Sequence, residues 1–150
     1  MSAERNTFQN MENEIGIVPS GDGGLEIIHT TTAKNNLGSI IVTHRDMYFA
    51  PSEAYTTLSS ELKNEAFGAC IKFSGGVLSS LLGVTSALLV NPSEKGIDQI
   101  QLWGSTAIGI LYGYKLLRES SLSLYNADII KKKLRELKKY IDDKDIKISP

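Results

Sequence analysis

Two histidines, His29 and His44, are the side chains of this sequence best suited to bind a metal ion. Each lies in a run of isoleucine, valine and threonine that is typical of a β-strand, so the two imidazoles could face each other across neighbouring strands. Asp46 or Glu26 would then add a carboxylate ligand. Histidines on strand surfaces are far more common than metal ligands, and we therefore expect no metal site here.

Catalytic motifs are incomplete. The tripeptide "HRD" at 44–46 opens a kinase catalytic loop, but "HRDMYFAPS" lacks the asparagine that must follow, and no glycine-rich loop with a strand lysine accompanies it. The segment "PSGDGG" has no GK[ST] and is interpreted as a turn, and no serine lies in a GxSxG motif. We expect neither an enzyme nor a cofactor.

The elements that would position these residues form a small N-terminal β unit. Residues 1–13 are polar and aperiodic, which predicts a disordered tail. Residues 14–51 contain the runs "EIGIV", "LEIIHTTT", "SIIVTH" and "MYFA", separated by glycine, proline and asparagine, and these predict three or four short strands. A unit of this size is smaller than a self-sufficient core, so it must pack on the following helices, a partner or another subunit.

Residues 52–117 predict a helical hairpin. Pro51 and Ser52 offer a start for one helix over about 53–90, "NPSEKG" at 91–96 forms the turn, and a second helix continues to about Leu117. The first contains "FSGGVLSSLLGVTSALLV", eighteen uncharged residues that span about 27 Å, close to the ~30 Å hydrocarbon core of a bilayer. The second offers only the fourteen residues "QLWGSTAIGILYGY" and is marginal alone.

Small residues recur every four positions on both predicted helices of the hairpin. In lipid, such faces let helix backbones approach closely, whereas in water each glycine costs about 1 kcal/mol relative to alanine. We therefore interpret the hairpin as transmembrane. The predicted helix-packing residues are Gly75, Ser79, Gly83, Ala87, Ser105, Gly109 and Gly113.

Residues 118–150 predict a separate amphipathic helix with a coiled-coil seam and a tail. Apolar or small residues follow heptad spacing from Ser123, and charged residues occupy the other positions. The predicted oligomerisation residues are Ala127, Ile130, Leu134, Leu137 and Ile141. The basic run could attract anionic lipid or an acidic partner, or be a solvated face. Its predicted lipid-binding residues are Lys131, Lys132, Lys133, Arg135, Lys138 and Lys139.

The charge distribution is polarised although the total is nearly neutral, with 16 basic and 17 acidic residues. This balance gives no argument for nucleic acid as a partner. The first 65 residues carry a net charge of about −5, and the basic run at 131–139 follows the second apolar segment. By the positive-inside rule, both termini of a two-pass protein are then expected in the cytoplasm. The single Cys70 excludes an intramolecular disulfide.

The sequence thus predicts an α+β chain: a β unit, a transmembrane hairpin and a C-terminal amphipathic helix. The functional hypothesis is a non-enzymatic, two-pass membrane protein that self-assembles, in its sharper form as a pore or membrane-perturbing effector. Its partners would be other copies, membrane lipids and a protein that docks on the β unit. The alternative is a soluble α+β structural or interaction subunit whose hairpin is buried against partners.

Overall fold

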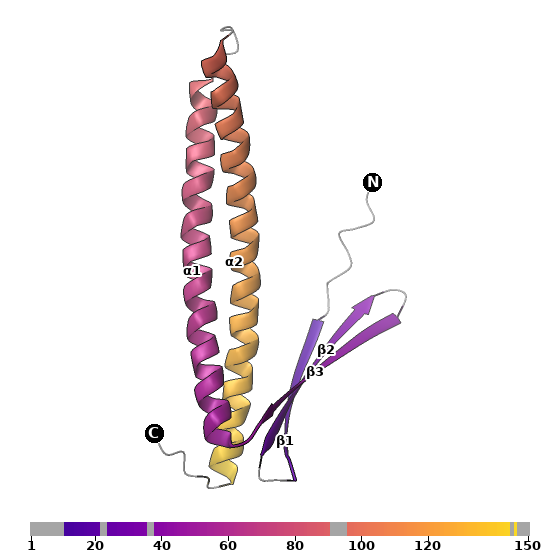
Figure 1. The fold of residues 1–150 in the computed structure, drawn as a ribbon. Helices are drawn as coiled ribbons and strands as arrows, with labels where there is room; N and C mark the ends of the chain where they lie inside the picture. Colours follow the sequence, from indigo (N-terminus) through magenta and orange to yellow (C-terminus); the bar gives the residue numbers. More distant parts are fainter. Residues whose placement is uncertain (1–10, 22–23, 36–37, 91–95, 145, 147–150) are drawn as a thin grey trace. The chain divides into compact units, whose positions relative to one another are not determined.

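The computed structural model describes residues 11–21, 24–35, 38–90, 96–144 and 146. The fold is α+β: a three-stranded antiparallel sheet is followed by two long helices (Figure 1). This order confirms an α+β chain in which a β unit precedes two helices. The chain divides into two compact units. The sheet unit combines the residues up to Ser60 with those from Ile129 onward, and the hairpin unit is Glu61–Asp128.

The sheet has the strand order β1-β2-β3, with β1 at Met11–Pro19, β2 at Leu25–Asn35 and β3 at Gly38–Tyr48. Two expectations need correction. The first strand begins at Met11, so the end of the predicted tail belongs to the sheet. The runs "SIIVTH" and "MYFA" lie in one strand, because the pairing of β2 with β3 continues without interruption from Asn35–Gly38 to Leu25–Tyr48.

Two glycines fit the sheet's turns for different reasons. Gly38 has φ of +144°, a backbone conformation that side chains rarely tolerate, and it opens β3. Gly24 lies so close to β3 that a Cβ atom there would be 2.7 Å from the carbonyl oxygen of Tyr48. The Gly24 carbonyl also accepts a hydrogen bond of 2.9 Å from the Ser20 amide. Gly24 therefore allows the chain that enters β2 to lie close against the end of β3.

Helix α1 spans Pro51–Leu89, within two residues of its predicted ends. Proline at the first helical position needs no amide partner, and the Glu53 carboxylate accepts a hydrogen bond from the Phe49 amide at 2.9 Å. Helix α2 spans Ile97–Asp143. The expected boundary near 117 is therefore wrong, and the predicted third helix is the second half of α2. The predicted turn at 91–96 falls outside the described residues except for Gly96.

The core of the sheet unit brings together the start of α1, the end of α2 and one face of the sheet. Leu25 and Ile27 of β2 are completely buried, as are Leu58 and Leu137. Burial of each such side chain contributes about 1.5–3 kcal/mol. The full cluster is Leu25, Ile27, Ala54, Leu58, Leu137 and Ile141, with Ile15, Ile17, Tyr48, Ile130, Leu134 and Tyr140 packed against it. The small β unit thus obtains its core from helices of the same chain.

In the hairpin unit, less exposed positions alternate at spacings of three and four along both helices. This is the spacing of two helices that pack along their length. On α1 the positions are occupied by Ala69, Lys72, Gly76, Ser79, Gly83 and Ser86. On α2 they are occupied by Leu102, Thr106, Gly109, Gly113, Leu116, Ser120, Ser123 and Ala127. The helices therefore face each other mainly with small or polar side chains, with Leu102 and Leu116 among them.

Candidate functional site

Four glycines form the closest contact in the hairpin unit. A Cβ atom built on Gly109 would lie 2.7 Å from the Gly83 Cα and 2.8 Å from the Ser79 carbonyl oxygen. A Cβ on Gly113 would lie 2.9 Å from the Gly76 carbonyl oxygen, and one on Gly83 would lie 2.9 Å from the Ile110 amide nitrogen. All of these neighbours are backbone atoms. The two helices therefore approach so closely that only glycine fits at these positions.

The structure places the predicted helix-packing residues in two groups. Five of them lie at the contact between the helices: Gly75, Ser79, Gly83, Gly109 and Gly113. Ala87 and Ser105 are exposed instead, and the Ser105 hydroxyl donates a hydrogen bond to the Leu102 carbonyl in its own helix. The sequence reasoning missed Gly76, which is buried.

Polar side chains link the helices at one end of this contact. The Ser120 hydroxyl donates to the Ala69 carbonyl oxygen at 2.9 Å, and the Lys72 ammonium donates to the Ser123 hydroxyl at 3.0 Å. The hydroxyl of Thr106 is buried, and it has no hydrogen-bond partner among the residues that the structure describes. The bonds of Ser120 and Lys72 each join residues 51 positions apart in the sequence, and they therefore fix the register of the two helices.

The outward surface of the hairpin unit is strongly apolar. Only 17% of the most apolar 18-residue window of α1 is buried, and α1 is the one described helix long and apolar enough to cross a membrane by length and composition. On α1 the exposed apolar belt consists of Val77, Leu78, Leu81, Leu82, Val84, Leu88 and Leu89. On α2 it consists of Ile100, Trp103, Ile108, Ile110 and Leu111. Most inward positions are thus small or polar, and the exposed belt consists of large apolar residues.

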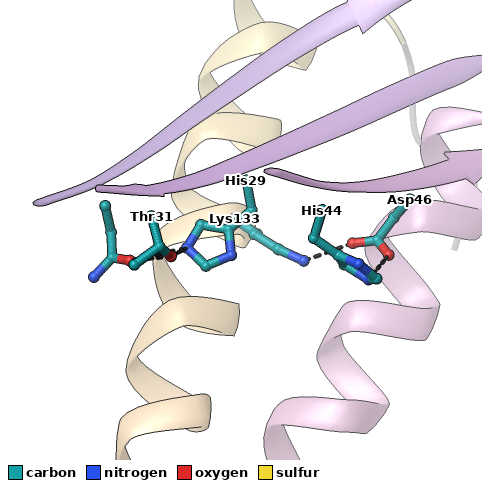
Figure 2. Close-up of polar contacts among 6 residues, drawn as sticks. His29, Thr31, His44, Asp46 and Lys133 are labelled. Carbon is teal, nitrogen blue, oxygen red and sulfur yellow. Dashed lines mark hydrogen bonds and ion pairs between the residues drawn. The ribbon is translucent and has the colours of Figure 1, made fainter. Parts of the chain in front are cut away.

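A polar cluster lies on the helix-facing side of the sheet. His29 and His44 are direct partners across β2 and β3, as predicted, and Asp46 lies two residues further along β3 on the same face. The Asp46 carboxylate accepts a bond from Lys133 Nζ at 2.5 Å, and its other oxygen lies 3.0 Å from His44 Nε2. Figure 2 shows the Lys133 side chain reaching from α2 to Asp46, with His44 on the other side of the carboxylate.

The His29 ring occupies the remaining part of this cluster. Its Nε2 lies 3.1 Å from Asn13 Oδ1 and 3.3 Å from the Thr31 hydroxyl, which itself donates to Asn13 Oδ1 at 2.9 Å. Burial lowers the pKa of His29 below its ordinary value of 6.5, and the positive charge of Lys133 lowers it further. The neighbouring His44 acts in the same direction, whereas Asp46 opposes them.

The arrangement of carboxylates does not favour a metal ion. Among the described residues, no group of three histidine, cysteine, aspartate or glutamate side chains is arranged to hold one. Glu26, the alternative ligand, pairs with Met47 and so lies on the opposite face of the sheet, where its carboxylate meets Arg45 at 3.4 Å. The Asp46 carboxylate instead ties the sheet to α2 through Lys133.

The predicted oligomerisation residues lie within the chain's own packing. Leu137 and Ile141 are buried in the core of the sheet unit, and Ile130 and Leu134 pack against it. Ala127 is buried within the hairpin unit. The heptad seam is thus occupied by contacts within one chain, and its role between copies stays a prediction.

The predicted lipid-binding run is split by the structure. Lys133 is 7% exposed and faces the sheet. Lys132 is partly buried, and the other members of the run, Lys131, Arg135, Lys138 and Lys139, are exposed. The sequence spacing does not single out Lys133, because the exposed Lys131, Arg135 and Lys138 are also direct neighbours of seam residues.

Comparisons with protein-family models, with curated proteins and with solved structures found no match to this chain. The candidate sites therefore rest on the sequence and geometry described above.

Proposed function

We propose that the chain is a non-enzymatic membrane protein whose hairpin unit spans a bilayer twice and holds the sheet unit at the membrane surface. One observation carries this proposal: small and polar residues make up most of the inward positions of the hairpin, whereas large apolar residues form its exposed belt. In water, two paired helices bury leucines and expose charges. The inverted arrangement suits a hydrocarbon solvent, in which close backbone contact supplies the attraction between helices.

The apolar residues also surround the hairpin rather than forming one stripe. On α1, residues 77–89 of the belt cover an arc of about 160° at 100° per residue, and the belt of α2 points away from it on the other side. One partner helix docked on the hairpin would cover only part of this surface. Lipid covers all of it, and this favours the bilayer over a subunit buried against a single partner.

The uncharged lengths of the two helices support a thin or slightly tilted span. On α1, residues 73–90 give about 27 Å, and on α2 the sixteen residues between Asp98 and Lys115 give about 24 Å. Lys115, which is exposed at the end of the second span, can extend its ammonium group toward the headgroups and so lengthen the span. The second pass is the weaker one, and its close packing on α1 compensates for its lower hydropathy.

Orientation follows from the charges that flank the belt. Lys72, Lys115 and Arg118 lie beyond its end nearer the chain termini, whereas Lys95 is the one basic residue of the connecting loop in the sequence. The positive-inside rule then places both termini in the cytoplasm. A reporter that is active only in the cytoplasm, fused after Pro150, tests this orientation.

Self-assembly and pore formation have less support than the anchor. The glycine faces that an assembly of copies would use for close packing already contact one another within the chain. A pore also needs a polar face toward its lumen, and the belt residues on both helices are apolar. We therefore propose an anchor with a docking unit, and permeabilisation stays a prediction to be tested.

The sheet unit is the part we propose to dock a protein partner. Its edge strand β3 carries three consecutive exposed apolar residues, Ile40, Ile41 and Val42, each more than half exposed. Long apolar edge strands attract a further strand, because their outer amides and carbonyls lack sheet partners. An extended segment of a partner protein fits this edge.

A pair of matched substitutions tests the membrane proposal. Leu81 and Leu124 are both 57% exposed, but Leu81 lies in the belt and Leu124 lies beyond Lys115 and Arg118. Aspartate at the centre of a membrane helix costs about 2.5–3.5 kcal/mol of insertion free energy. Leu81→Asp should therefore shift the protein out of the carbonate-resistant membrane fraction, and Leu124→Asp should not. Wild type released by carbonate, or equal behaviour of the two variants, would contradict the proposal.

A further inference from the structure

One face of α2 continues from the apolar belt into a pair of basic residues. Its members follow the spacing of a single helix face, alternating by four and three residues, and all are exposed: Gly104, Ile108, Leu111, Lys115, Arg118, Leu122 and Tyr125. Lys115, Arg118, Leu122 and Tyr125 line a shallow groove together with Glu119 and Ser121. Along α2 this face therefore begins with apolar residues, continues with the basic pair Lys115 and Arg118, and ends with Leu122 and Tyr125.

The two cations of this face are available to an anion. Arg118 has no ion-pair partner among the residues that the structure describes. The Lys115 ammonium lies 3.9 Å from the Glu119 carboxylate, and both side chains are exposed, so this pair contributes little and is easily exchanged. Lys72, by contrast, is directed into the hairpin by its bond to Ser123. The groove thus holds two outward positive charges against one weakly paired carboxylate.

From this juxtaposition we propose that the outward face of α2 binds an anionic phospholipid, with the headgroup phosphate between Lys115 and Arg118. The inference rests on the proposed membrane span, because that span puts these residues at the level of the headgroups. One acyl chain would lie along Ile108 and Leu111, which continue the same face into the belt. Arginine and lysine are the usual phosphate ligands, and Tyr125 suits the interface, where its ring and hydroxyl meet both environments.

The basic run at 131–139 belongs to the sheet unit and is the rival lipid contact, so the test below compares the two sites.

The test uses the full chain in a neutral detergent and two charge-matched double variants. Lys115→Gln with Arg118→Gln removes the proposed site, and Lys131→Gln with Arg135→Gln removes one exposed lysine and one exposed arginine from the basic run. Binding of fluorescent phosphatidylglycerol is measured by anisotropy, with phosphatidylcholine as the neutral lipid and inorganic phosphate as competitor. Each basic residue near an anionic headgroup changes affinity about fivefold.

We expect wild type to prefer phosphatidylglycerol, the Lys115/Arg118 variant to bind it roughly 20- to 30-fold more weakly, and the Lys131/Arg135 variant to bind as wild type. Equal losses in the two variants, or no loss in the first, would overturn the site. Competition by inorganic phosphate at lipid concentrations would show a free-phosphate site and overturn the lipid assignment. Carbonate extraction of wild type separates the two proposals: a resistant protein without lipid preference refutes only this site, whereas a released protein refutes the membrane span itself.

Discussion

Replacing Gly109 with alanine should weaken the hairpin, although alanine is the better helix former. The new Cβ would lie 2.7 Å from the Gly83 Cα, 2.8 Å from the Gly83 amide nitrogen and 2.8 Å from the Ser79 carbonyl oxygen. Carbon contacts are optimal at about 3.5–4.0 Å, so the backbones must separate by roughly 1 Å. No flexible side chain can move aside, because all three neighbours are backbone atoms.

The size of the effect follows from two opposed terms. Forcing an extra methyl group into a well-packed contact costs about 1–3 kcal/mol, and the change from glycine to alanine returns about 1 kcal/mol of helix propensity. The net loss should be about 0–2 kcal/mol. Gly104→Ala on the same helix is the matched control, since nothing lies within 4 Å of its Cβ and the residue is exposed. It receives the propensity gain without the clash.

The assay is reversible unfolding of the detergent-solubilised protein in sodium dodecyl sulfate, followed by circular dichroism and by amide hydrogen exchange of residues 76–86. The two variants should differ by about 1–3 kcal/mol in free energy of unfolding, with Gly109→Ala the less stable. Faster exchange around Gly83 in Gly109→Ala alone would locate the effect at the contact. Equal stability of the two variants would refute the glycine contact as described.

Three further predictions concern the sheet unit and the seam. Lys133→Met removes the ammonium group from the Asp46 carboxylate, which is left with its His44 contact, and should lower the free energy of unfolding by about 1–3 kcal/mol. The loss is smaller than for a fully buried pair because Asp46 is partly exposed. Hydrogen exchange of the β3 amides measures it, with Lys131→Met as an exposed control. The pKa of His29 is lower in the folded chain than in the unfolded chain, so the unfolded chain binds more protons as the pH falls. The contribution of His29 to the free energy of unfolding should therefore be fully present above pH 6.5 and decrease below it. His29→Gln should reduce the pH dependence of the melting temperature in this range. Leu137→Asp should place a charge in the core of the sheet unit and so lower its melting temperature. An unchanged melting temperature together with a smaller oligomer by light scattering would show instead that the seam joins different copies.

The strands and α1 were predictable because local signals agree with the final packing. Pro51 begins α1 in the structure as its fixed φ suggests, and the run of isoleucines and threonines from Leu25 pairs on both sides as a central strand. The end of the second helix was not predictable from composition. Polar and basic residues replace apolar ones after Leu117, but the three-four spacing of inward residues continues unbroken to Ile141, so the environment of the helix changes while its structure does not.

Helix geometry explains why Ala87, one of the predicted helix-packing residues, lies outside the contact. A step of four residues turns a helix by 400°, so positions repeated every four residues drift by about 40° each time. From Gly75 to Ala87 the drift is about 120°, which carries Ala87 to the exposed side, so that the neighbouring Ser86 is the less exposed position at that level of the helix. The inward position of Lys133 needed the structure for a similar reason, because its carboxylate partner lies 87 residues away in sequence.

The division of the chain into units has a consequence for the order in which the protein is made. The core of the sheet unit joins Leu25 and Ile27, near one end of the chain, to Leu137 and Ile141, near the other. The strands and the start of α1 are synthesised first, so Ala54 and Leu58 are available to cover part of the apolar face of the sheet, but the rest stays exposed until the last part of α2 has left the ribosome. Leu25 and Ile27 therefore complete their packing only after the hairpin unit has been synthesised. A ribosome that stalls before residue 129 would release a chain whose sheet is only partly covered, which is the kind of intermediate that chaperones and proteases recognise.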